Sequence, residues 1–364
     1  MEIRRLTIAG LDQLMHSDEI AHWSSLPISP LRLLSQMKNP QLESEDIVMI
    51  IAVENNELAG YIGALPDQMK VEGSLYHVAW ASCLWTDPAC RGKGLAKKLT
   101  AAMTEAWNGK LFLTEFTAGA KAVYDSLGLF DTFCIKTGYR YFYKGIFYAV
   151  ARNRYGPNAF MTGLAWLADM VINFFLRQRT SGKLLLGKKT TYSIMESSVE
   201  DLTEDNCPES PFIHNTEKNK WIFLKPWLSS EKANACDRYY FQTLVNCFQF
   251  RSVSFCGTDH LPLARLFFSR VNNDCKVLSF SIETNIALND IGLKRDIERF
   301  FVTEGVNAVL SYDEEYNKLM EQKGRLFFLR KSRKREYLAG KDFFRQLPAL
   351  KYAARELDGD IVFT

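Results

Sequence analysis

The fold of the first part of the chain is decided by the stretch Asp87-Pro88-Ala89-Cys90-Arg91-Gly92-Lys93-Gly94-Leu95-Ala96-Lys97-Lys98-Leu99. The apolar run Val78 to Trp85 before it predicts a β-strand, and proline ends that strand because it has no N–H to donate to a neighbour. Large apolar residues then recur at four-residue steps, which predicts an amphipathic helix: Leu95, Leu99, Met103 and Trp107. The chain therefore passes from a strand through a glycine-rich turn into a helix.

This turn has the features of an anion-binding site. The first N–H groups of a helix have no partners within the helix, and the helix dipole adds partial positive charge at the same end. Gly92 and Gly94 allow the backbone to turn tightly and to approach a bulky anion without an intervening Cβ. Four basic side chains surround the turn: Arg91, Lys93, Lys97 and Lys98. Two glycines alone would indicate a plain turn, but the combination favours a site for a pyrophosphate.

The flanking segments predict an α/β fold with a mixed (α+β) sheet. Helices are expected at 11–23, 95–107 and 119–127, separated from one another by strands. The strand candidates are Ile3 to Leu6, Ile47 to Val53, Leu58 to Leu65, Val78 to Trp85 and Leu111 to Phe116.

Two motifs resemble those of the GNAT acyltransferase superfamily. Arg91-Gly92-Lys93-Gly94-Leu95-Ala96 is similar to the R/Q-x-x-G-x-G/A loop, which binds the pyrophosphate of acetyl-CoA in that family. About thirty residues further on, the segment from Thr117 to Leu129 resembles N-x-x-A-x-x-x-Y-x-x-x-G-F, with Tyr124 at the tyrosine position. It departs from the pattern at both ends, where Thr117 replaces Asn and Leu129 replaces Phe. The resemblance covers residues 1–150 well and implies the GNAT acyl-CoA N-acyltransferase fold.

The resemblance also implies roles for individual residues. Tyr124 would protonate the leaving thiolate, and Glu115 and His77 are candidate general bases, although a solvated charge is the alternative for both. A core tyrosine with its hydroxyl at the rim is the alternative for Tyr124. The implied cofactor-binding residues are Leu84, Trp85, Thr86, Arg91, Gly92, Lys93, Gly94, Leu95, Ala96 and Thr117. The implied cosubstrate is acetyl-CoA or another acyl-CoA, with an amine on a small molecule or peptide as acceptor.

The chain is long enough for two domains. We expect a GNAT domain at 1–150, an apolar connecting helix and linker at 151–190, and a second, degenerate GNAT-like domain at 191–364. The order of elements in the second half resembles that of the first, with Trp221 to Leu224 and Leu326 to Arg330 among its expected strands. No phosphate loop follows Val277 to Ile282, so the second domain is expected to shape the acceptor site or a homodimer surface.

Composition limits the partners and the compartment. The 45 basic and 42 acidic residues leave a net charge of +3, which argues against nucleic acid as the main partner. None of the eight cysteines forms a C-x-x-C pair, so we expect no metal site. The N-terminal sequence does not predict a signal peptide. Together with unpaired cysteines, this indicates a cytoplasmic protein, and we expect a bacterial one.

The segment from Asn158 to Leu176 is unusually apolar, and Asp169 is its single charged residue. Its length nearly suits a bilayer span. Because Asp169 and Asn173 interrupt it, we predict instead a helix buried between two domains, without membrane contact.

The sequence therefore predicts an acyl-CoA-dependent N-acyltransferase. Two alternatives remain open. One is a non-catalytic acyl-CoA sensor or scaffold, and the other is a Fem-like aminoacyl transferase, which the intact phosphate loop disfavours.

Overall fold

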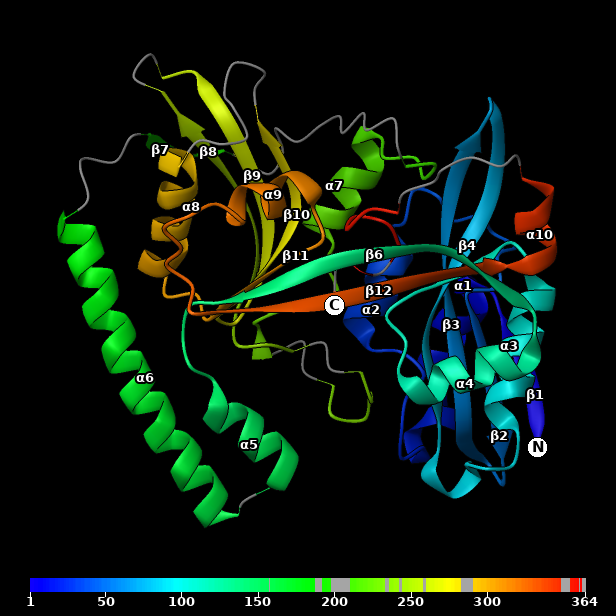
Figure 1. The fold of residues 1–364 in the computed structure, drawn as a ribbon. Helices are drawn as coiled ribbons and strands as arrows, with labels where there is room; N and C mark the ends of the chain where they lie inside the picture. Colours follow the sequence, from blue (N-terminus) through cyan, green and yellow to red (C-terminus); the bar gives the residue numbers. More distant parts are fainter. Residues whose placement is uncertain are drawn as a thin grey trace. The chain divides into compact units, whose positions relative to one another are not determined.

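The fold is seen in a computed structural model, which describes residues 1–156, 158–186, 192–197, 210–232, 236–241, 244–257, 260–282, 291–347, 354–359 and 361. The chain divides into two compact units (Figure 1). The first contains 1–136, 200–246 and 335–364, and the second contains 137–199 and 247–334. The units are interleaved along the chain, whereas the sequence predicts successive segments divided near 150 and 190.

The first unit is built around an antiparallel meander that continues into a parallel pair. The strands β1 to β4 pair in order, β4 pairs in parallel with β5, and β5 pairs antiparallel with β12. The strands are β1 (Glu2–Leu6), β2 (Met49–Glu54), β3 (Glu57–Val71), β4 (Ser74–Thr86), β5 (Leu111–Leu113) and β12 (Leu329–Gly340). The helices are α1 (Ile8–Met15), η1 (Asp18–His22), α2 (Pro30–Gln36), η2 (Pro88–Cys90), α3 (Leu95–Ala106), α4 (Ala118–Leu127), α7 (Thr216–Leu224) and α10 (Lys341–Gln346).

The second unit repeats the same order of elements. In each repeat four antiparallel strands lead to a helix, a strand parallel to the fourth, a second helix and a long final strand. The elements are α5 (Phe147–Tyr155), α6 (Ala159–Leu186), β7 (Ser193–Ser197), β8 (Phe248–Cys256), β9 (Pro262–Val271), β10 (Asp274–Ile282), α8 (Ile291–Thr303), β11 (Ala308–Ser311) and α9 (Glu314–Met320).

The final strands are exchanged between the two repeats. The long strand after α4 is β6 (Phe130–Phe142), and its last residues pair with β11 in the second unit. The long strand after α9 is β12, and its last residues pair with β5 in the first unit. Each repeat therefore contributes one strand to the other unit's sheet, which explains why the compact units are not contiguous in sequence.

Side chains cap several of the helices in the way their sequences suggest. Thr7, Thr117 and Asp313 each accept a backbone N–H from the first turn of α1, α4 and α9. Ser29 does the same for α2, where proline follows in the first turn. Such caps satisfy N–H groups that the helix itself leaves without partners.

Buried ion pairs join the three segments of the first unit. Lys218 Nζ on α7 lies 2.7 Å from Asp67 Oδ1 on β3, and their side chains are only 4% and 2% exposed. Trp80 Nε1 donates to the other oxygen of Asp67 at 3.0 Å. His214 Nε2 lies 2.7 Å from Asp358 Oδ1. Burial opposes ionisation of Asp358, but the hydrogen bond with His214 and the nearby charges of His214 and Lys218 together outweigh it and hold the pKa of this carboxyl below its usual value.

Some expectations for individual segments are wrong. Trp221 to Leu224 ends helix α7 instead of forming a strand, because Asn215 caps a helix there. Thr180 to Gly182 lies within α6, which continues to Leu186, instead of forming a linker. The strand expected at Leu326 to Arg330 begins instead at Leu329 and continues to Gly340. The basic residues 330–335 lie within this strand, and the predicted linker residues 188–191 lie outside the described part of the chain.

The expected burial of the apolar segment is also wrong. Phe160–Gln178 is the described helical segment long and apolar enough to cross a membrane, and only 6% of it is buried.

Candidate active site

The site begins where β4 and β5 separate. The two strands pair in parallel from Ala79 with Leu111 to Ala81 with Leu113, after which β5 ends and β4 continues to Thr86. The register between β3 and β4 shifts just beyond this point. Cys83 lies in the shift with a φ of 56°, which is uncommon for a residue with a side chain. Within the described part of the chain, the bulge and the early end of β5 leave the edge of β4 that faces away from β3 without a strand partner.

The predicted residues Leu84, Trp85 and Thr86 form this end of β4. Trp85 and Thr86 pair with Tyr61 and Gly60 of β3. The side chain of Trp85 is buried and stacks on Tyr61, with ring centroids 5.4 Å apart. The backbone of this strand end is therefore placed to contact an extended ligand lying along the strand.

The predicted phosphate loop follows directly and begins helix α3. Asp87 Oδ1 accepts the N–H of Ala89 at 2.7 Å and turns the chain away from the sheet. Gly92 and Gly94 have φ values of 77° and 76°, and nothing lies within 4 Å of a Cβ added at either position. Gly94 caps α3 without a side-chain hydrogen bond, so the first-turn N–H groups have no side-chain cap.

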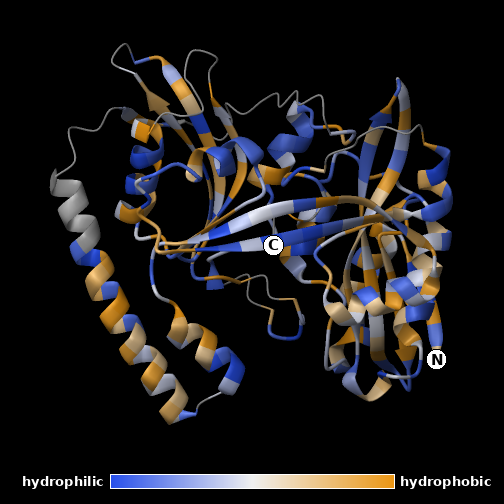
Figure 2. Ribbon diagram, in the orientation of Figure 1, coloured by the Kyte–Doolittle hydropathy of each residue, from blue (hydrophilic) through white to orange (hydrophobic). Residues whose placement is uncertain are grey.

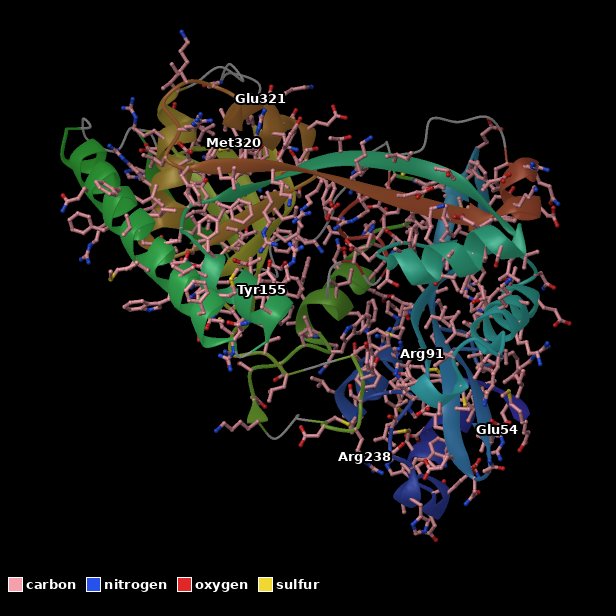
Figure 3. All side chains as sticks on the ribbon, turned by 60° about the horizontal axis from the view of Figure 1, so that its bottom comes forward. Glu54, Arg91, Tyr155, Arg238, Met320 and Glu321 are labelled. Carbon is pink, nitrogen blue, oxygen red and sulfur yellow. The ribbon has the colours of Figure 1, made fainter. Side chains whose placement is uncertain are left out.

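The loop is exposed and positively charged. Arg91, which is labelled in Figure 3, and Lys93 are exposed on it, and Lys97 and Lys98 are exposed on the first turns of α3. Leu95 is buried and anchors the helix in the core with Leu99. The structure thus presents the predicted charges to solvent around two open glycines, as a site for a polyanion requires.

The second motif forms helix α4. The hydroxyl of Thr117 accepts the N–H of Ala120 at 3.2 Å, so this predicted cofactor residue caps the helix. The side chain of Tyr124 is 5% exposed. Its ring lies between Phe116 and Phe130, with both centroids 5.8 Å away. Tyr124 and Leu95 belong to the same buried cluster, so the two motifs share one core.

Glu115 has a different setting from the one expected. It follows β5 instead of lying on it, and its φ is 51°. Its carboxylate forms an ion pair with Arg335 of β12, which also binds the buried Glu356. The structure therefore engages this candidate base in an ion pair with the neighbouring strand.

His77 lies at the far end of β4. It is nine residues before Thr86, which corresponds to about 30 Å along an extended strand. Its Nε2 lies 2.8 Å from Asp46 Oδ1, and its Nδ1 lies 3.8 Å from Glu43 Oε1. These three residues also meet the geometric requirement for a shared cation, but the direct contact with Asp46 already accounts for their arrangement. His77 is therefore too distant to act as the base at the separated strands.

The His77–Asp46 contact predicts a pH-dependent contribution to stability. The hydrogen bond with Asp46 raises the pKa of His77, so the imidazolium is favoured in the folded state. Its stabilisation is complete below the unfolded pKa of about 6.5 and is lost as the pH rises through the higher folded value. His77→Gln should therefore lower the free energy of unfolding by up to about 1 kcal/mol at about pH 5.5, and by less at about pH 8.5. Urea denaturation at both values tests this, and a difference independent of pH would contradict it.

The structure places a buried arginine, Arg32, beside the bulge, and the sequence did not predict it as a site residue. Arg32 Nη2 donates to Ser82 Oγ at 2.7 Å, and Nη1 lies 2.6 Å from Cys83 Sγ and 3.3 Å from Tyr239 Oη. Its guanidinium carbon also lies 4.4 Å from the centroid of the Trp227 ring. The cluster holds the bulged strand in place. No local motif marks it, because its members come from distant segments that only the fold brings together.

A family comparison supports the resemblance over part of the chain. Residues 12–129 match the model of the Acetyltransferase (GNAT) family. A GCN5-related N-acetyltransferase from Anabaena variabilis is 10% identical, with a TM-score of 0.45, and the match covers 93% of this chain and 71% of that one. Saccharomyces cerevisiae N-myristoyltransferase with bound myristoyl-CoA is also 10% identical, with a TM-score of 0.47 and coverages of 93% and 82%.

No curated protein matches the sequence. The family match includes β4, the phosphate loop and α4, which are the elements that the site geometry singles out. Residues 12–129 therefore form an acetyltransferase domain of the GNAT family.

Proposed function

We propose that this chain is an acyl-CoA-dependent N-acyltransferase that transfers an acetyl or similar acyl group to an amine. One observation carries the proposal: a loop with two open, positive-φ glycines begins α3 directly beside the end of β4 that β5 leaves unpaired. The loop suits the pyrophosphate of CoA, and the strand edge suits its pantetheine, which pairs with a backbone as an additional strand would.

The bound thioester would lie along Leu84 to Thr86. Its phosphates would accept hydrogen bonds from the amides of the loop, with Arg91 and Lys93 neutralising the charge. A neutral amine attacks the thioester carbonyl, and the tetrahedral oxyanion is stabilised by backbone N–H groups of β4. When the carbon–sulfur bond breaks, Tyr124 protonates the thiolate, and the amide nitrogen loses its extra proton to water because Glu115 is held by Arg335.

Two measurements test this proposal in order. Calorimetric titration with CoA and acetyl-CoA tests the site, for which we expect saturable binding with one ligand per chain. Release of free thiol from acetyl-CoA, followed in the presence of a panel of amines, tests the chemistry. Absence of CoA binding by a folded protein would overturn the proposal.

A non-catalytic acyl-CoA sensor is the alternative function, and the ion pair between Glu115 and Arg335 favours it, because that pair engages the carboxylate considered as the general base. Binding of acetyl-CoA without thiol release, over an amine panel that includes polyamines, aminoglycosides and peptides, would support the sensor. An acceptor that accelerates thiol release would exclude it.

Replacing Tyr124 by Phe should reduce kcat by about a hundredfold, because the leaving thiolate then has to take its proton from water. The phenyl ring keeps the contacts with Phe116 and Phe130, so we expect the Kd for acetyl-CoA to stay unchanged. Steady-state kinetics with an identified acceptor and calorimetry of the same preparation measure both effects. Unaltered kcat would remove Tyr124 from the mechanism.

The second repeat is proposed to shape the acceptor site or a dimer surface, without an acyl-CoA site of its own. The segment that corresponds in order to the phosphate loop is 283–290, which lies outside the described residues. A stoichiometry of two CoA molecules per chain in the titration would contradict this part of the proposal.

A further inference from the structure

In the hairpin of α5 and α6, the polar residues of α6 face the protein and its large apolar residues face outward. In a water-exposed helix, polar residues face solvent and apolar residues face the protein. In α6, Asp169 accepts the N–H groups of Phe147 and Tyr148 at the start of α5, both at 2.8 Å. Asn173 similarly accepts the N–H of Gly145 at 2.7 Å. The only charge of the apolar segment is therefore directed toward α5, where it complements the positive end of that helix.

The opposite face of α6 consists of large apolar side chains. Figure 2 shows much of the α6 ribbon coloured as apolar, with polar positions interspersed. The members of the apolar face are between 45% and 73% exposed, and they are Phe160, Leu164, Trp166, Leu167, Met170, Val171, Phe174 and Phe175. At about 100° per residue they cover roughly half of the helix circumference. An apolar face of this extent on a described helix marks an interaction surface.

Basic residues lie at both ends of this face. Arg152 and Arg154 are exposed in the last turn of α5, next to Tyr155 at the tip of the hairpin, which Figure 3 labels. Arg177 is exposed after the apolar face of α6. Between Asp131 and Glu196 the sequence contains one acidic residue, Asp169, and the following basic ones: Lys136, Arg140, Lys144, Arg152, Arg154, Arg177, Arg179, Lys183, Lys188 and Lys189.

We propose that the α5–α6 hairpin binds the surface of an anionic lipid bilayer, with the apolar face of α6 inserted among the acyl chains. A half-circumference apolar face with cationic ends matches an interfacial helix, since its side chains enter the membrane while arginines bind the headgroups. A helix–helix interface with a second copy would use a narrower apolar stripe flanked by polar residues. This surface departs from the expectation of no membrane contact, and it does not depend on the proposed acyl transfer.

The contacts of the hairpin favour an interfacial position over a spanning one. Gly145 is bonded to Asn173, near the end of the apolar segment. The preceding Lys144 donates to Gly305 O at 2.8 Å, and Tyr143 N donates to Asn307 O at 2.8 Å, so the body of the second unit begins there. If α6 crossed a bilayer, Asp169 near its middle would bring the start of α5 and the adjoining sheet into the hydrocarbon. With α6 lying in the membrane surface, the sheet remains in water.

Flotation of the full chain with lipid vesicles tests the proposal. We expect the chain to float with vesicles of phosphatidylcholine and phosphatidylglycerol and to bind vesicles of phosphatidylcholine alone much less. The double variant Leu167→Glu, Val171→Glu places two charges on the apolar face and should lower binding by about tenfold or more. The matched control is Leu75→Glu, Ile135→Glu, at positions 59% and 61% exposed outside the hairpin, which should bind like the wild type.

Circular dichroism and CoA titration show whether each variant is folded. Equal binding by the wild type and the Leu167→Glu, Val171→Glu variant would overturn the proposal. The proposal would also be overturned if the wild-type chain bound neither kind of vesicle but formed a dimer in sedimentation equilibrium, and if the Leu167→Glu, Val171→Glu variant abolished that dimer. Resistance to extraction from the vesicles by alkaline carbonate would overturn the interfacial position, because only a spanning helix resists it.

Discussion

Replacing Gly94 by Val should raise the Kd for CoA by about 10²- to 10⁴-fold. The φ of Gly94 is 76°, where a β-branched residue is strongly disfavoured. A Cβ at this position would meet no protein atom, so it would project into the space where the pyrophosphate has to approach the amides. Loss of two charge-assisted hydrogen bonds at about 1.5–3 kcal/mol each corresponds to this change in affinity. Calorimetry with CoA measures it.

Gly73→Val is the matched control. Gly73 also has a positive φ, 85°, with nothing within 4 Å of an added Cβ, but it lies in the turn between β3 and β4, away from the loop. Both variants carry similar backbone strain, so they should lose similar thermal stability. Only Gly94→Val should lose CoA binding. Equal affinities in the two variants would show that CoA binds elsewhere, and the proposed function would then lose its main support.

The phosphate loop was predictable because its signal is local. A strand, a proline, two glycines and a helix stripe occur within one short stretch, and each has a physical meaning without knowledge of the fold. The long strand β6 was not predicted, and only the start of β12 was, since each completes the sheet of the other repeat. A strand whose pairing partner is distant in sequence shows no local sign of that pairing beyond a moderate alternation of apolar and polar residues.

Two errors show where sequence patterns are ambiguous. Trp221 to Leu224 is an apolar run too short to distinguish a strand from one turn of helix, and the cap at Asn215 decides it. The apolar face of α6 was assigned to a buried helix because hydropathy indicates that a surface needs covering without indicating what covers it. Only the contacts of Asp169 reveal that its polar side faces the protein.

Asp67→Asn should lower the free energy of unfolding by about 3–5 kcal/mol. The carboxylate of Asp67 is the ion-pair partner of Lys218, and both side chains are buried. An amide would leave a buried ammonium without its direct ion-pair partner, which costs much more than the lost attraction across an exposed pair. The bond joins β3 to α7, so the variant should weaken the attachment of residues 210–232 to the rest of the first unit. Urea denaturation at neutral pH measures the change.

Two further variants separate charge burial from simple loss of a contact. Glu105→Gln removes the exposed partner of Arg5, a pair with a similar N–O distance of 2.6 Å, and should cost less than about 1 kcal/mol. The double variant Asp67→Leu, Lys218→Met removes both buried charges and should recover much of the stability that Asp67→Asn loses, because no ion then remains unpaired. If the double variant were at least as unstable as Asp67→Asn, the attraction between the two charges would itself stabilise the unit. The fold of the first unit would then depend on this ion pair and not only on its apolar core.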